Sequence, residues 1–106
     1  MAWAVEYHEL VEQDLHKLDN AQRKQVFKAM KKVSQNPLPD FEGGYGRPLG
    51  NRAASQLAGY CKIKLRKSGL RIVYGIVRQQ GTMKVTVISV RDDEMVYRLA
   101  EQRIKP

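Results

Sequence analysis

The sequence is poor in the residues from which many catalytic and metal sites are built. It has one cysteine, Cys61, which excludes an internal disulfide framework and a zinc site made of several cysteines. Its two histidines, His8 and His16, are predicted to lie eight residues apart on one helix, without a third ligand at a useful spacing. We therefore expect no metal and no cofactor.

Long apolar runs are missing as well. No stretch of about 18 apolar residues is present, so no membrane-spanning helix is predicted. Residues 1–6 lack the basic region and the apolar run of a secretory signal peptide. With 106 residues, the chain is expected to form one domain over residues 1–106 with a modest core, located in the cytoplasm.

Acidic residues are absent from a long central stretch, residues 43–91. The whole chain has a formal net charge of +8, and every Asp and Glu precedes or follows that stretch. Such segregation predicts a positive field over one side of the molecule, which attracts phosphates. An anionic membrane is a weaker alternative, because the cations are predicted to lie on strands rather than on an amphipathic helix. The cations of the stretch are Arg47, Arg52, Lys62, Lys64, Arg66, Lys67, Arg71, Arg78, Lys84 and Arg91.

Residues 60–74 carry the most informative pattern of the sequence. Basic and apolar residues alternate over residues 62–66, which predicts a strand, and Ser68-Gly69 predicts a tight turn into a second strand. A two-residue turn would set Arg66 opposite Arg71, and residues directly opposite share a face of the sheet. The cations expected on that one face are Lys62, Lys64, Arg66 and Arg71.

Crowding of like charges on this hairpin needs a reason, because like charges placed opposite each other destabilise a sheet. A polyanionic partner is one reason. A solvated outer face, with Lys and Arg serving solubility, is the plain alternative. Cys61 falls on the opposite, apolar face of the hairpin, so it is predicted to be a small core residue rather than a nucleophile.

The remaining pattern predicts an α+β fold. Asp19 and Gln22 have the spacing of a capping box, and Phe27 belongs to the expected buried stripe of the helix that follows. The lysines near the end of that helix and Asp93 in the first turn of the last helix suit the helix dipole. The elements expected in order are a strand near residues 3–7, helices over about 9–18 and 19–35, a mobile connection over 43–50, the hairpin, a strand over 84–90 and a helix over 93–103 with Asp92 as its cap.

These elements predict a small antiparallel sheet of about four strands. Two N-terminal helices pack on one face of the sheet, a short C-terminal helix follows the last strand, and the opposite face is partly open.

Candidate chemistry is left to Lys, Arg and Tyr. Cleavage of RNA requires that the 2′-hydroxyl lose a proton, that the charged phosphorane be stabilised and that the 5′-oxygen gain a proton. A lysine among other cations is expected to have a lowered pKa, which makes it a candidate base. Arginines can bind the non-bridging oxygens, and a tyrosine can exchange a proton. Arg91 and Tyr97 are the residues outside the hairpin that could close over it.

Residues 60–74 resemble the signature hairpin of RelE-type toxins in the RelE/ParE toxin–antitoxin superfamily. Val87-Ile88-Ser89-Val90-Arg91 and then Val96-Tyr97 resemble the closing strand and terminal helix of that family. The resemblance implies a type II toxin, a ribosome-dependent endoribonuclease that needs no metal. Such a toxin cuts mRNA in the ribosomal A site by 2′-OH attack, leaves a 2′,3′-cyclic phosphate and a 5′-OH, and so inhibits translation.

The resemblance also implies roles for single residues. Lys62 and Lys64 match lysines that bind phosphate and assist base catalysis, and Arg71 matches the arginine that stabilises the transition state. Arg91 matches the proposed general acid and Tyr97 the proposed general base. The sequence departs from the family at Gly50, where an arginine is usual. Contacts with RNA or the ribosome are expected from Arg47, Arg52, Arg66, Lys67 and Arg78.

The implied partners are a cognate antitoxin protein, the 70S ribosome and mRNA, with operator DNA bound only through the antitoxin complex. Two alternatives remain open. A ParE-like inhibitor of DNA gyrase would share the scaffold but lack the catalytic set. A non-catalytic RNA-binding module would use the same cations only to hold phosphates.

Overall fold

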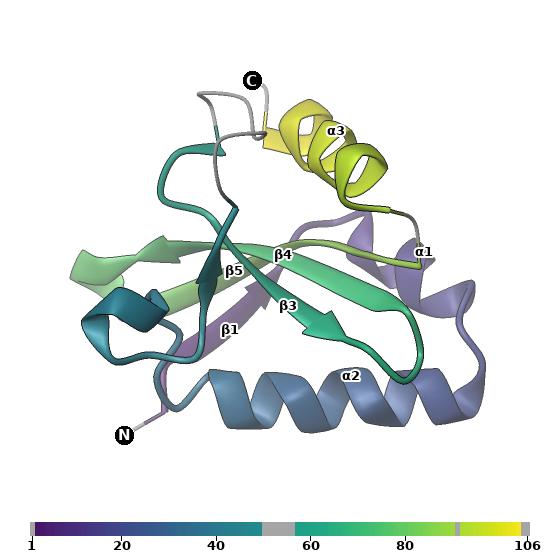
Figure 1. Cartoon of the computed structure of the whole chain (residues 1–106), viewed down its shortest axis with the longest axis horizontal. Helices are drawn as coiled ribbons and strands as arrows, with labels where there is room; N and C mark the ends of the chain where they lie inside the picture. Colours follow the sequence, from purple (N-terminus) through teal and green to yellow (C-terminus); the bar gives the residue numbers. More distant parts are fainter. Residues whose placement is uncertain (1, 50–56, 91, 105–106) are drawn as a thin grey trace.

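The computed structural model of the chain describes residues 2–49, 57–90 and 92–104 (Figure 1). It contains one five-stranded sheet, in the order β1-β5-β4-β3-β2. The class is α+β, as the sequence predicts. The strands are β1 (Ala4–Tyr7), β2 (Arg47–Pro48), β3 (Cys61–Leu65), β4 (Leu70–Val77) and β5 (Thr82–Ser89). The helices are α1 (Val11–His16), α2 (Asn20–Val33) and α3 (Asp93–Ile104), with short 3-10 turns η1 (Asp40–Glu42) and η3 (Arg78–Gln80).

The sheet is mixed rather than purely antiparallel. β1 runs parallel to β5, whereas the β2–β3, β3–β4 and β4–β5 pairs are antiparallel. The parallel pair forms because α1 and α2 carry the chain away from β1, and β5 returns beside it only after the meander of β3 and β4. The fifth strand, β2, lies in the segment that the sequence analysis treats as a mobile connection. The absent side chain of Gly46 lets this segment pass close to Tyr74 and Cys61.

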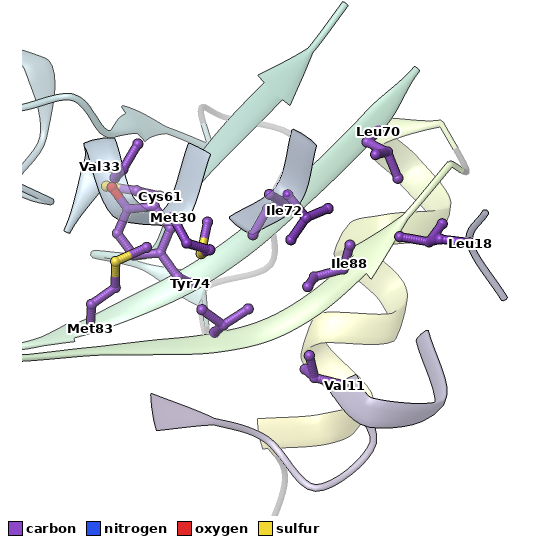
Figure 2. Close-up of a cluster of buried hydrophobic side chains, with 12 residues drawn as sticks. Val11, Leu18, Met30, Val33, Cys61, Leu70, Ile72, Tyr74, Met83 and Ile88 are labelled. Atoms are coloured by element: carbon purple, nitrogen blue, oxygen red, sulfur yellow. The ribbon is translucent and has the colours of Figure 1, made fainter. Parts of the chain in front are cut away.

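The main core lies between the sheet and the two N-terminal helices. In Figure 1, α2 runs along one side of the sheet and α3 lies on the other. The capping box predicted at the start of α2 is present, because Gln22 N donates to Asp19 Oδ1 and Asp19 N donates to Gln22 Oε1. Phe27 was expected in the buried stripe, but it is 50% exposed. The side chains of this core include Val11, Leu18, Met30, Val33, Cys61, Leu70, Ile72, Tyr74, Met83 and Ile88 (Figure 2).

A second, smaller core covers the face that the sequence predicted to be partly open. Val73 and Val87 on that face are fully buried beneath α3. Helix α3 contributes Val96, Tyr97 and Ala100 to the same cluster. The cations of the hairpin therefore lie beside a packed helix rather than on a bare sheet.

Helix α3 is also tied down by a buried ion pair near its C-terminal end. Arg103 Nη1 and Nη2 lie 2.6 and 2.9 Å from the two carboxylate oxygens of Asp14 on α1. Asp14 Oδ2 also accepts a hydrogen bond from Ile88 N at 3.0 Å. β1 pairs with β5 only as far as Val85, so the Asp14 carboxylate takes the place of a strand partner for Ile88.

The register of the hairpin differs from the predicted one by two residues. Arg71 pairs with Lys64, not with Arg66, and Leu65 pairs with Leu70 across a four-residue loop, residues 66–69. A two-residue turn of type I′ or II′ needs positive φ at its first central residue, and Ser68 does not have it; Gly69 alone does, with φ of 69°. A shift of two residues keeps every strand residue on its predicted face. None of the helices in the described ranges is long and apolar enough to span a membrane.

Candidate functional site

Three cationic side chains meet on one face of the β3–β4 hairpin. Lys62 and Lys64 are two residues apart on β3, so both point to the same side of the sheet. Arg71, at the start of β4, is the direct partner of Lys64 and points to that side as well. The structure thus brings together Lys62, Lys64 and Arg71, and Tyr97 joins them through Lys62, so that four of the five residues predicted to be catalytic meet here.

An acidic residue of α3 joins these three cations. Arg71 Nε lies 2.6 Å from Asp93 Oδ1, and the Nζ atoms of Lys62 and Lys64 lie 3.4 and 3.7 Å from Asp93 Oδ2. The Asp93 side chain keeps 30% of its exposure, and those of Lys62 and Arg71 keep 15% and 22%. The site is therefore shallow and half-buried, with one carboxylate at the point where the cations converge. We call Lys62, Lys64, Arg71 and Asp93 the anion cluster, because its three cations surround one anionic group.

Mutual charge shapes the protonation states in the anion cluster. Burial alone would raise the pKa of Asp93, but the hydrogen bond from Arg71 and the charges of both lysines lower the pKa below its ordinary value. Burial alone would lower the pKa of Lys62, but the hydrogen bond to Tyr97 and the charge of Asp93 raise it above its ordinary value. The prediction that crowding lowers the pKa of a lysine here is therefore wrong for Lys62, because a carboxylate from a distant helix lies among the cations.

Tyr97 lies directly behind Lys62. Its hydroxyl oxygen accepts a hydrogen bond from Lys62 Nζ at 2.9 Å, and its hydroxyl donates to the carbonyl of Leu49 at 3.3 Å. Lys62 Nζ is also 5.6 Å from the centre of the Tyr97 ring. Tyr97 is only 6% exposed, so it supports Lys62 from within the α3 core rather than facing solvent.

The residues predicted to bind RNA or the ribosome lie at different distances from the anion cluster. Arg47 on β2 is exposed and is the direct partner of Lys62, so it shares the face of the cluster. Arg66 and Lys67 lie in the loop of the hairpin, not on its strand. Arg78 lies beyond the far end of β4, where it forms two hydrogen bonds with Glu42. Arg52 and Arg91 lie outside the described residues.

A groove of about 450 Å³ separates α2 from the hairpin loop. Lys28 and Lys32 line it from α2, and Lys32 Nζ lies 5.2 Å from the ring centre of the exposed Tyr45. The helix dipole, which the sequence offers as the reason for the α2 lysines, does not account for this arrangement. The hairpin contributes Lys64, Leu65, Arg66 and Lys67 to the groove, and Arg66 and Arg71 also line a second hollow of about 310 Å³ around the loop.

Comparison with known proteins places the chain in a family. No protein-family model matches the sequence. An Escherichia coli protein named as a RelE-like toxin is 32% identical over 109 residues, which cover 99% of this chain and all of that protein. Among solved structures, a mutant of the E. coli toxin RelE in the free state matches with a TM-score of 0.75 and 25% identity, over 99% of this chain and all of that one.

Structures of toxin–antitoxin complexes match as well. The same E. coli RelE mutant bound to a peptide of the antitoxin RelB has a TM-score of 0.68 and 25% identity, over 99% of this chain and all of that one. The RelBE2 complex of Mycobacterium tuberculosis has a TM-score of 0.67 at 23% identity, over 86% of this chain and 93% of that one, which supports the fold alone. With a curated relative 32% identical over its whole length, the chain belongs to the RelE-like toxin family.

Proposed function

We propose that this RelE-like toxin is a ribosome-dependent endoribonuclease that cuts mRNA in the A site and so inhibits translation. The observation that carries the proposal is the convergence of Lys62, Lys64 and Arg71 on one carboxylate. A carboxylate and a phosphodiester are both monoanions with two oxygens that accept hydrogen bonds. A site that holds the first at 2.6–3.7 Å has the donors and the charge to hold the second.

In the proposed reaction, the 2′-oxygen attacks phosphorus and the bond from phosphorus to the 5′-oxygen breaks. The products are a 2′,3′-cyclic phosphate and a 5′-hydroxyl, so the proton lost by the 2′-hydroxyl is balanced by one gained at the 5′-oxygen. Arg71 and Lys62 donate to the non-bridging oxygens, where the phosphorane gains negative charge. Because the pKa of Lys62 is raised, Lys62 acts in its protonated form.

The proposed roles of Lys64 and Tyr97 follow from their exposure. Lys64 is the most exposed cation of the anion cluster, with 36% of its side chain accessible, so we assign it the first contact with an incoming RNA. The resemblance makes Tyr97 the general base, but its buried hydroxyl contacts Lys62 and Leu49. We assign Tyr97 to the positioning of Lys62 in the free protein. The resemblance gives Arg91 the role of general acid.

Dependence on the ribosome follows from the chemistry of this cluster. Among the described residues, the contacts of the cluster join Lys, Arg, Asp and Tyr but neither histidine: His8 Nδ1 accepts a hydrogen bond from Leu10 N instead. Without a strong acid–base pair, positioning of the reacting 2′-oxygen in line with phosphorus supplies much of the rate. We propose that the ribosome imposes this geometry on the codon, while the 450 Å³ groove and Arg47 bind ribosomal or messenger RNA backbone.

We also propose a cognate antitoxin as the protein partner of this toxin. Structural relatives include RelE bound to a peptide of its antitoxin RelB, which supports a partner of this kind. Acidic groups of the antitoxin would neutralise the anion cluster and the groove, and operator DNA would be bound only through the complex. We propose no membrane partner.

The proposal is tested by mapping the 5′ ends of an mRNA incubated with the protein, with and without translating ribosomes. The expected result is cuts within the A-site codon that require ribosomes. Arg71→Ala should reduce the cutting rate by roughly a hundredfold or more, since it removes a donor to the developing charge. Lys84→Ala is the matched control, because this exposed cation of β5 pairs with Gly75, away from the anion cluster. An intact message alongside gyrase-linked DNA breaks would instead support the ParE-like alternative. Equal loss of RNA affinity in both variants, without cutting by either, would support the binding module.

A further inference from the structure

The Asp93 carboxylate occupies the centre of the site in which the proposed function places a phosphate. Asp93 belongs to the first turn of α3, and α3 is fixed at its other end by the Arg103–Asp14 ion pair. The two carboxylate oxygens of Asp93 contact three cations from two strands, Arg71, Lys62 and Lys64. A helix-dipole role would explain an acid in this turn, as it does for Glu94, which pairs with Arg98 one turn along the same helix. It does not explain why Asp93 contacts the hairpin.

We propose that Asp93 is a built-in competitor of the RNA phosphate: its carboxylate must leave Lys62, Lys64 and Arg71 before a phosphodiester can bind them. This inference rests on the proposed function for the nature of the ligand. A side chain that keeps 30% of its exposure can rotate away from the cations into solvent without unfolding α3. Displacement therefore requires a change of rotamer rather than a change of fold.

The cations have other contacts besides those with Asp93. Lys64 and Arg71 are direct partners in the hairpin, and Lys62 is held by the Tyr97 hydroxyl at 2.9 Å. Removal of the carboxylate is therefore expected to leave the donors in place and to uncover them. The opposite role, in which Asp93 organises the donors, would make its removal weaken RNA binding.

Competition of this kind costs the bound substrate and the transition state equally, because the carboxylate must leave before the phosphodiester binds. A phosphodiester carries one negative charge, so its exchange for the Asp93 carboxylate changes the charge at the site very little. Asp93 thus reduces the affinity for RNA, which lowers non-productive binding to the abundant RNA of a cell.

The test is the affinity of the purified protein for a short single-stranded RNA whose 2′-hydroxyls are methylated, so that it cannot be cut, measured by fluorescence anisotropy. Asp93→Asn is expected to bind this RNA roughly tenfold more tightly than the natural sequence does at low salt. The slope of the logarithm of affinity against the logarithm of salt concentration should be steeper by about 0.7 in the variant. Glu94→Gln removes the same charge from the same helix turn and should change the affinity by less than about twofold. Asp93→Glu keeps the charge on a longer arm and should return the affinity toward that of the natural sequence.

Two outcomes overturn the inference. If Asp93→Asn and Glu94→Gln change the affinity equally, the effect is one of net charge alone. If Asp93→Asn binds more weakly, Asp93 organises the cations. With ribosomes, Asp93→Asn should lower KM for mRNA without raising kcat. The anisotropy assay does not require cutting. If the natural sequence fails to cut mRNA, the proposed function is refuted, but the measured effect of Asp93 on RNA affinity stands.

Discussion

Replacement of Asp14 by Ala should show how strongly the fold depends on one buried carboxylate. The pair with Arg103 is bidentate, and the two side chains keep only 8% and 10% of their exposure. Asp14→Ala leaves the Arg103 guanidinium with its hydrogen bond to the Thr86 carbonyl, and it removes the acceptor of Ile88 N. Loss of one partner of a buried pair costs about 3–5 kcal/mol, because the other charge stays buried and uncompensated.

That loss is a large share of the stability of a 106-residue chain, which is expected to be about 5–15 kcal/mol. Each kcal/mol shifts Tm by roughly 4–8 °C in a domain of this size, so Tm should fall by about 12 °C or more. The measurements are urea unfolding followed by circular dichroism and a thermal melt at the same pH.

Glu94→Ala supplies the matched control on the same helix. It breaks a carboxylate–guanidinium contact of 2.7 Å, but Glu94 and Arg98 keep 75% and 65% of their exposure. The expected loss is about 0.2–0.5 kcal/mol, because water screens an exposed pair one helical turn apart. Equal losses in the two variants, or a loss below about 1 kcal/mol for Asp14→Ala, would refute the argument that burial makes the Asp14 pair important.

Three further predictions concern the site. Tyr97→Phe should lower the pKa of Lys62, since the lost hydroxyl helps to raise it, so cutting should decline at a lower pH in a pH–rate profile. Arg78→Ala should leave ribosome-dependent cutting within about twofold in end mapping, because Arg78 pairs with Glu42 away from the cluster. Folding lowers the pKa of Asp93, so the stability that its carboxylate confers should be complete above about pH 4–5 and disappear as pH falls through the lowered pKa. Urea unfolding of Asp93→Asn and of the natural sequence across pH 2–7 tests this.

Local physical chemistry determined much of this protein from its sequence. Alternation through residues 62–66 assigned Lys62 and Lys64 to one face and Cys61 to the other, because successive residues of a strand point to opposite sides. The capping box of Asp19 and Gln22 located the start of α2, since both hydrogen bonds join residues three apart. The α+β class followed from the order of these elements.

Tertiary structure decided what joins the cations. Asp93 is separated from Lys62 by 31 residues in the chain, and only the packing of α3 over Val73 and Val87 brings its carboxylate to the hairpin. The same packing reverses the expected pKa shift of Lys62. Strand pairing between distant segments likewise made β1 parallel to β5 and set Arg47 beside Lys62. Local pattern specifies which face a side chain takes, but the charge it meets there depends on contacts that only the folded chain forms.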